Sequence, residues 1–310
     1  MPLDILRDAL QQELQDKTVI ADFIGERRCI FLGHLWHAEK VIAERLKALG
    51  TGRPAWPDID GGKAIPWVER KLGVALAESQ KKAVQIALSS KVMVITGGPG
   101  VGKTTLVNAI LNILVVKDVT VALAAPTGRA AKRLSESTGM EAKTIHRLLE
   151  VDPRHGGFKR GIDNPLECDL LVIDETSMVD VPLMASMVKA LPNKAALMLV
   201  GDVDQLPSVG PGRVLADIID SGAVRAARLT EIFRQAAQSQ IITNAHKVNS
   251  GYMPNLDAPK SGNSDFYFVE ASEPEDGISK IIEVVKNRLP NRFGFDPIKD
   301  IQVLCPMNRG

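Results

Sequence analysis

The spacing of apolar side chains divides the first fifty residues into helical and strand-like segments. Between residues 3 and 16 the apolar positions recur every three or four residues, at Leu3, Leu6, Leu10 and Leu14, which predicts an amphipathic helix. Two apolar runs, TVIADF and RRCIFL, flank Ile24-Gly25-Glu26 and predict a β-hairpin. A second helical pattern ends at Gly50. The sequence therefore predicts a small α+β unit over residues 1–50.

The pattern changes after a segment rich in turn-forming residues. Residues 51–66 contain three glycines and three prolines, which predicts a linker. Beyond the linker, four continuous apolar runs alternate with helical stretches, at residues 91–98, 119–126, 169–175 and 195–202. Continuous apolar runs suit strands buried on both faces of a parallel sheet. Their alternation with helices is typical of βαβ units and predicts an α/β domain over residues 67–255.

The last segment, residues 256–310, is expected to enter a further domain. It begins with a loop, followed by a strand-like run, DFYFVE, at residues 265–270. A helix is predicted from about Glu273 to Arg288, and a final apolar run, IQVLCP, occupies residues 301–306.

Composition and charge narrow the classes of function. Thirty-eight Lys and Arg residues against thirty-seven Asp and Glu residues leave a net charge of +1, which excludes a basic protein that coats nucleic acid non-specifically. No apolar stretch reaches the ~18 residues of a membrane helix, and the polar beginning lacks the apolar core of a signal peptide. From this we expect no membrane partner. Cys29, Cys168 and Cys305 lie far apart, without paired spacing for zinc or disulfides, so we expect a reducing cytoplasm.

The strongest chemical signal is a glycine-rich loop after the first of the four apolar runs. It reads Gly97-Gly98-Pro99-Gly100-Val101-Gly102-Lys103-Thr104, followed by Thr105 and a helical run. Glycines allow backbone N–H groups to turn toward phosphate oxygens, and the following helix adds a partial positive charge. Lys103 can reach the β- and γ-phosphates, and the Thr104 hydroxyl can bind Mg²⁺.

Two carboxylates follow the third apolar run. Asp174 would lie at the carboxyl-terminal edge of the sheet, where a nucleotide-bound Mg²⁺ would sit. Glu175, next in the chain, is suited either to orient or to deprotonate a water molecule. This pair favours a nucleotide hydrolase over a simple nucleotide-binding module, which needs the phosphate loop but not Glu175.

Other polar residues near strand ends indicate coupling of a nucleotide to nucleic acid. Gln205, in GDVDQLP, can hydrogen-bond a γ-phosphate and report its loss. Arg234, in LTEIFRQ, can stabilise transition-state charge. The segment APTGRAAKR at residues 125–133 combines a hydroxyl with three cations, Arg129 among them, which suits a nucleic-acid backbone.

These segments together resemble the RecD-like DNA helicases, superfamily-one motors that move 5′ to 3′. The resemblance runs from about Gln80 to Gly310 and rests on TGGPGVGKTT, APTGRAAKRLSESTG, TIHRLL, LLVIDETSMVD, LVGDVDQLPSVGPG, LTEIFRQ and QVLCPMNRG. It implies a RecA-like P-loop domain, a parallel sheet flanked by helices. The small amino-terminal unit more weakly resembles the winged-helix-like segment of the RecD2-type branch.

The resemblance also implies roles for individual residues. Gln80 would read adenine, Lys103 and Thr104 would hold phosphate and Mg²⁺, and Asp174 and Glu175 would supply a metal ligand and the base. Gln205 would sense the γ-phosphate and Arg234 would stabilise the transition state. The residues implied along single-stranded DNA are Pro126, Thr127, Arg129, Thr144 and His146.

The resemblance leaves three further expectations. Residues 150–169 occupy the place of a duplex-splitting pin hairpin, with His155-Gly156-Gly157 as its turn, although a solvated loop without a role is also open. We expect a monomeric ATP- and Mg²⁺-dependent motor on single strands and single-to-double-strand junctions, active in DNA repair and recombination. The 310 residues would be a fragment that binds nucleotide with little unwinding.

Other functional hypotheses stay open from the residues alone. The helicase portion of a conjugative relaxase would carry similar motifs, although nothing in residues 1–90 resembles a nicking domain. A transport or remodelling ATPase would have a different sensor arrangement from GDVDQLP. A nucleotide-binding regulatory module without turnover is the third alternative.

Overall fold

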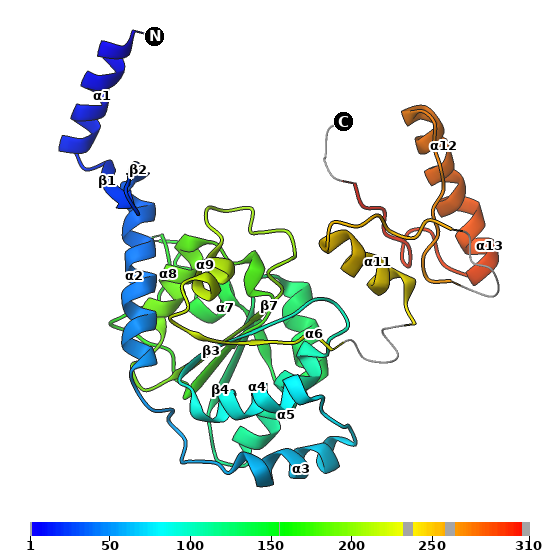
Figure 1. The fold of residues 1–310 in the computed structure, drawn as a ribbon, viewed down its shortest axis with the longest axis horizontal. Helices are drawn as coiled ribbons and strands as arrows, with labels where there is room; N and C mark the ends of the chain where they lie inside the picture. The colour runs from blue at the N-terminus through cyan, green and yellow to red at the C-terminus, as the bar shows by residue number, and fades with distance from the viewer. Residues whose placement is uncertain (1, 155, 232–237, 258–263, 306–310) are drawn as a thin grey trace. The chain divides into compact units, whose positions relative to one another are not determined.

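The computed structural model describes residues 2–154, 156–231, 238–257 and 264–305, which fall into two compact units, Met1–Gln238 and Ser239–Gly310 (Figure 1). The boundary between the units therefore follows Gln238, whereas the sequence predicted it between residues 255 and 256. Asn244, on α11 (Gln240–Asn249), donates to the carbonyl of Asn255 at 3.1 Å and accepts from its N–H at 2.8 Å. These hydrogen bonds join α11 to the residues that follow it.

The predicted helix, hairpin and second helix are confirmed at the amino terminus. They are α1 (Leu3–Gln15), β1 (Val19–Ile24), β2 (Arg27–Leu32) and α2 (Gly33–Gly50), with β1 and β2 antiparallel. The structure places α2 in the core of unit 1, where Ile42, Leu46 and Leu49 are buried. Arg45 fixes it there by donating to the carbonyls of Val188 and Leu191 and to the side chain of Asn193.

Part of the predicted linker is a helix. The helix α3 (Gly61–Leu72) begins inside residues 51–66, and the Asp60 carboxylate caps it by accepting the Gly62 N–H at 2.9 Å. Pro66 lies within this helix, yet Ile65 and Val68 bury its apolar face. Upstream, buried Trp56 donates its indole N–H to the carbonyl of Leu88 at 2.9 Å. Burial therefore outweighs the loop-forming tendency of the glycines and the proline here.

Six parallel strands form the sheet of unit 1, in the order β5-β4-β6-β7-β3-β8. The four apolar runs are confirmed as strands: β3 (Val92–Thr96), β4 (Val121–Ala125), β6 (Leu170–Ile173) and β7 (Ala196–Gly201). The outer strands β5 (Ala142–Thr144) and β8 (Arg225–Arg228) were not predicted. They are short, and β8 carries an arginine at each end, so neither has an apolar run.

Helices cover both faces of the sheet (Figure 1), which explains why the strands are continuously apolar. Along β3, Met93 and Ile95 enter one core cluster, whereas Val92 and Val94 enter the other. The first cluster includes side chains from α3, α4 (Glu78–Ser89), α5 (Lys103–Val115) and α6 (Gly128–Thr138). The second includes side chains from α2, α7 (Ile145–Leu149), α8 (Val181–Ala190) and α9 (Val214–Asp220).

Unit 2 is helical in its described residues. It contains α11, α12 (Pro274–Glu283), the short π-helix η2 (Val284–Arg288) and α13 (Leu289–Phe293), which agrees with the predicted helix over 273–288. The strand predictions at 265–270 and 301–306 are wrong for the described residues, because this unit offers no described strand to pair with. None of the described helices has the length and apolar character to cross a membrane.

Candidate functional site

The carboxyl ends of the parallel strands meet at one edge of the sheet and frame a cavity of about 760 Å³. The phosphate loop follows β3, and Asp174 and Glu175 follow β6, with β7 between these two strands. The cavity brings together most of the predicted nucleotide-site residues, namely Gly98, Pro99, Gly100, Gly102, Lys103, Thr104, Thr105, Asp174, Glu175 and Gln205. The edge of the sheet thus has the composition predicted for a nucleotide site.

The phosphate loop needs its glycines for backbone conformation and for close packing. Gly100 and Gly102 both have φ of +76°, and Gly102 immediately precedes the first residue of α5. At Gly97 a Cβ atom would lie 2.6 Å from the carbonyl oxygen of Leu229, so a larger residue would displace the loop. Lys103 Nζ donates to the carbonyls of Gly97 at 2.6 Å and Gly98 at 3.1 Å. This ammonium group is therefore held over the loop.

Burial changes the acidity of the two carboxylates. Loss of solvent raises the pKa of Asp174, and the charges of Lys103 and Arg133 oppose that rise. The pKa of Glu175 is also raised, first by burial and then by the neighbouring Asp174 charge. Glu175 has a left-handed backbone with φ of +52°, and its Oε2 is buried without a hydrogen-bond partner among the described residues. One carboxylate oxygen at this edge is left to accept a proton or a hydrogen bond.

Gln80 lies behind the phosphate loop and is not a lining residue of the cavity. Its side chain is 1% exposed, and its Oε1 accepts the backbone N–H of Ala77 at 3.0 Å. Its Nε2 donates at 3.3 Å to the carbonyls of both Val101 and Gly102. The amide of Gln80 thus braces the loop through its backbone. Val101, also among the predicted binding residues, is 2% exposed and packs in the core.

Sequence reasoning missed one wall of the cavity. The helix α6 contributes five lining residues, Ala130, Arg133, Leu134, Glu136 and Ser137, and all but Glu136 recur at i, i+3, i+4 and i+7. Arg133 had been grouped with the cations expected to face nucleic acid, but its charge lowers the pKa of both Asp174 and Glu175. The helical spacing of these residues was the signal that could have assigned Arg133 to the cavity.

The residues predicted to contact DNA lie at two neighbouring strand ends. Ala125, at the end of β4, pairs with Thr144, at the end of β5, so the segments that follow leave the sheet side by side. Thr127 caps α6 by accepting the Ala130 N–H at 3.2 Å, and Thr144 caps α7 by accepting the Arg147 N–H at 3.2 Å. Pro126 is half-buried, whereas Arg129 and His146 are exposed.

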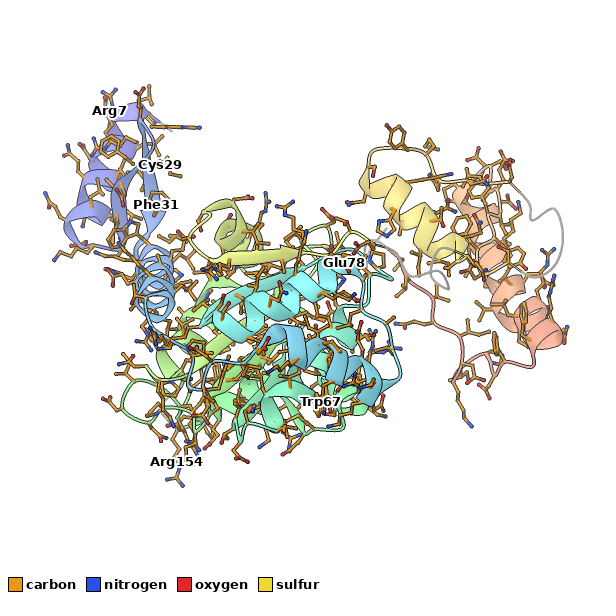
Figure 2. The ribbon with its side chains drawn as sticks, turned by 60° about the horizontal axis from the view of Figure 1, so that its bottom comes forward. Arg7, Cys29, Phe31, Trp67, Glu78 and Arg154 are labelled. Atoms are coloured by element: carbon orange, nitrogen blue, oxygen red, sulfur yellow. The ribbon has the colours of Figure 1, made fainter. Side chains whose placement is uncertain are left out.

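The insert at residues 150–169 folds back on itself beside His146. Val151 and Phe158 form one antiparallel bridge, and Gly156 and Gly157 both have φ of +75°. The Phe158 ring lies 5.7 Å from the His146 ring. Figure 2 shows Arg154 pointing outward from the edge of the unit. The insert is a compact turn without regular strands, and His155 lies outside the described residues.

Arg234, predicted to stabilise the transition state, also lies outside the described residues. The remaining predicted catalytic residues, Lys103, Glu175 and Gln205, line one cavity. A lysine, a carboxylate and an amide gathered in this way are compatible with phosphoryl transfer from a nucleotide.

Comparisons with known proteins identify relatives of this chain. A family model described as an AAA domain matches residues 80–211. The chain is 36% identical over 287 residues to the ATP-dependent RecD2 DNA helicase of Deinococcus radiodurans, covering 92% of this chain and 37% of that protein. It is 38% identical over 215 residues to the RecBCD enzyme subunit RecD of Mycolicibacterium smegmatis, covering 62% and 37%. The corresponding subunit of Mycobacterium tuberculosis is 36% identical over 275 residues, covering 80% and 46%. The chain thus spans less than half the length of these relatives.

Proposed function

Since the chain is a homologue of RecD2 and RecD over most of its length, we propose that it carries the nucleotide-binding motor of a DNA helicase. In this proposal ATP hydrolysis drives 5′-to-3′ movement on single-stranded DNA and the unwinding of duplex, in DNA repair and recombination. The single observation that carries it is the cavity shared by the phosphate loop, Asp174, Glu175 and Gln205.

The donor set at this cavity suits a nucleotide together with Mg²⁺. Carboxylate and hydroxyl oxygens are ligands that Mg²⁺ prefers, and Asp174 and Thr104 would supply one of each. The described residues contain no cluster of three or more His, Cys, Asp or Glu that could hold a metal alone, so nucleotide phosphates would complete the coordination. Mg²⁺ would stabilise negative charge developing on the transferred phosphoryl group. Lys103 would exchange its bonds to Gly97 and Gly98 for phosphate oxygens.

Glu175 would act as the general base on the attacking water. Its unpartnered Oε2 can accept the water proton, and its raised pKa brings it closer to the pKa that suits a base near neutral pH. Gln205 would hydrogen-bond the γ-phosphate from the loop after β7 and relay its loss along residues 205–213. Arg234 would stabilise the transition state, and Gln80 would read adenine as well as brace the phosphate loop.

Single-stranded DNA would pass over the ends of β4 and β5. A threonine hydroxyl that caps a helix uses a lone pair, so the hydroxyl hydrogens of Thr127 and Thr144 can still donate to phosphate oxygens. Arg129 and His146 are exposed beside them and can add charge and a stacking surface. The insert at residues 150–169 packs on His146 through Phe158, which supports a pin role at a junction. The motor would act as a monomer.

DNA-stimulated ATP hydrolysis by the full-length protein tests this function. We expect Lys103→Ala to reduce hydrolysis to background, whereas Lys189→Ala, an exposed lysine on α8, should leave it unchanged. Hydrolysis that is indifferent to single-stranded DNA would exclude a helicase motor. Nucleotide binding without any turnover would instead favour a regulatory module.

Glu175→Gln separates catalysis from binding. We expect nucleotide affinity to persist while turnover falls by about 10²–10⁴, the usual contribution of a general base. In the unsubstituted protein, turnover should fall as the pH is lowered, because only the ionised form of Glu175 accepts a proton. Since burial raises the pKa of Glu175, the midpoint of this fall should lie at a higher pH than the ordinary glutamate pKa of about 4.3. Unchanged turnover in Glu175→Gln would remove Glu175 from this role.

A further inference from the structure

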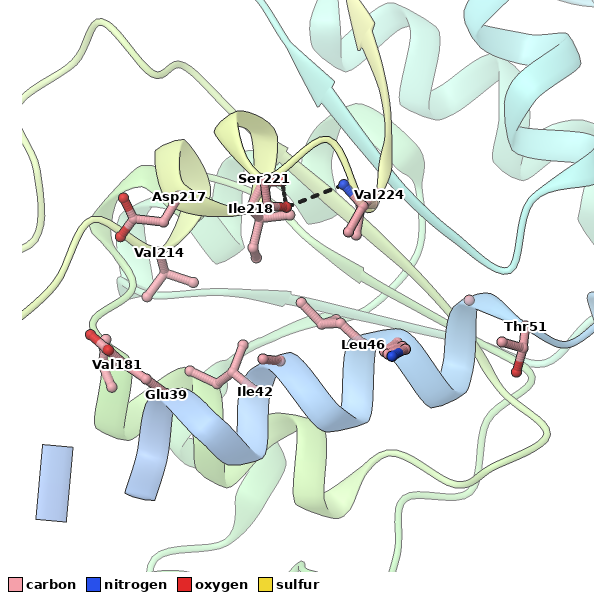
Figure 3. Close-up of a pocket in the computed structure, with 14 residues that line it drawn as sticks. Glu39, Ile42, Leu46, Thr51, Val181, Val214, Asp217, Ile218, Ser221 and Val224 are labelled. Carbon is pink, nitrogen blue, oxygen red and sulfur yellow. Dashed lines mark hydrogen bonds between the residues drawn. The ribbon is translucent and has the colours of Figure 1, made fainter. Parts of the chain in front are cut away.

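Unit 1 contains a second large cavity, on the side of the sheet covered by α2, α8 and α9. It measures about 770 Å³ and lies between α2 and α9 (Figure 3). We call it the α2–α9 groove. Its larger apolar lining residues are Ile42, Leu46, Val181, Val214, Ile218 and Val224, and Ala43 and Ala223 also line it. It shares no lining residue with the cavity at the phosphate loop.

The walls of the α2–α9 groove are fixed by contacts outside it. Arg45 ties α2 to the end of α8 through the carbonyls of Val188 and Leu191. On the other wall, Leu215 of α9 is buried and packs against Gly201 at the end of β7. Protein interiors are close-packed, and a volume of this size is typical of a binding site. Because neither helix can shift without breaking these contacts, the groove is a preformed site open to solvent.

Charged side chains line the α2–α9 groove at one end and about two thirds of the way along it. Glu39 and Asp217 face each other at one end, as Figure 3 shows. Lys47 lies two turns further along α2, about 12 Å away at 1.5 Å per residue. Both side chains are exposed, yet the pKa of Glu39 is raised, first by partial loss of solvent and then by the negative charge of Asp217, so the two carboxylates repel each other weakly. No ion pair involves any of the three in the part of the chain that the structure describes.

We propose that the α2–α9 groove binds a helical segment of a partner protein that is apolar along one face, basic in its first turn and acidic in its last turn. Apolar side chains of the segment would fill the space above Ile42, Leu46 and Ile218, as in other helix-in-groove interfaces. Cations of its first turn would relieve the repulsion between Glu39 and Asp217. Carboxylates of its last turn would meet Lys47.

Charge complementarity fixes the direction of the bound helix. The partial positive charge at the amino terminus of the bound helix would also be attracted by Glu39 and Asp217, and the partial negative charge at its carboxyl terminus would be attracted by Lys47. The groove follows α2 from Glu39 to Thr51, about 18 Å, which matches a helix of about 12 residues. The apolar lining would supply affinity, and the charged side chains would supply orientation.

Two labelled 14-residue peptides of identical composition test this proposal by fluorescence anisotropy with the full chain. Both carry leucines on one helical face; one has lysines in its first turn and glutamates in its last, and the other has these charges reversed. We expect the first peptide to bind at least about tenfold more tightly, although the reversed peptide is the better isolated helix because its charges suit its own dipole. Equal binding, or no binding of the first peptide, would overturn the proposal.

Matched variants locate the binding on the protein. The double variant Glu39→Gln/Asp217→Asn should weaken the first peptide about fivefold or more, whereas Glu44→Gln/Asp220→Asn, on the same helices outside the groove, should not. Ala43→Trp, which narrows the groove, should abolish binding, while Ala48→Trp, exposed on α2 away from it, should not.

If sedimentation shows a dimer that Ala43→Trp dissociates, the occupant is a second copy and the proposal is wrong. None of these variants touches the nucleotide cavity, so the result is independent of the proposed motor function.

Discussion

A largely apolar helix of unit 1 and an amphipathic helix of unit 2 differ in how far their apolar side chains are buried. In unit 1, α5 buries Leu106, Ile110 and Leu114 completely against the sheet. In unit 2, α12 keeps Ile281 49% and Ile282 56% exposed, and Asn244 is the only buried residue among those described. A helical repeat of apolar residues therefore specifies a face, but the partner that covers the face decides whether it contributes to stability.

Among the substitutions that test this contrast, truncation of a central side chain of the sheet should change the free energy of unfolding most. Leu199, on β7, is completely buried, so Leu199→Ala should lower the free energy of unfolding of unit 1 by about 2–5 kcal/mol. All three tryptophans lie in unit 1, and their fluorescence during urea unfolding reports this unit. A loss below about 1 kcal/mol would mean that the core of unit 1 is no better packed than unit 2.

Helix capping should give an intermediate effect confined to one unit. Thr127 and Ser239 make the same kind of cap, on α6 and α11, each accepting a backbone N–H at 3.2 Å. Thr127→Ala should lower the stability of unit 1 by about 1 kcal/mol, within a range of about 0.5–2. Ser239→Ala should leave the tryptophan-reported transition unchanged. Equal shifts from both substitutions would show that the two units unfold together.

The smallest effect is expected from an apolar residue of unit 2. Ile281→Ala should change the tryptophan-reported free energy of unfolding by less than about 0.5 kcal/mol, because nearly half of this side chain is already in water. The same urea titration provides the measurement. A loss of 2 kcal/mol or more would contradict the contrast between α5 and α12.

The same contrast explains how far the fold could be predicted. The strands β3, β4, β6 and β7 were predictable because both their faces are buried, which requires an unbroken apolar run. The run at 265–270 has equally strong strand propensity but no described strand beside it. In α3, Asp60 caps a helix whose Gly61 and Pro66 favour a loop, and burial of Val68 decides the outcome.

Some residues of the candidate site could be placed from the sequence, and others could not. The phosphate loop, Asp174 and Gln205 could be placed from sequence, because each follows a strand of one parallel sheet. Arg133 was missed, because the helical spacing of the α6 residues indicates that they share a face but not that this face lines the cavity. The hydrogen bonds of Gln80 to the back of the loop depend on contacts between α4 and residues more than twenty positions away.

The anchoring of α2 has a consequence for the order of folding. The groups that hold Arg45 lie 143 to 148 residues further along the chain. At ~5–20 residues per second, a ribosome needs roughly 7–30 s to make that intervening stretch. During this interval only part of the core cluster that buries Ile42, Leu46 and Leu49 has been made, so this early segment is incompletely covered until α8 is complete. The helix α2 is thus synthesised among the first elements but fixed in place only after most of unit 1 has been made.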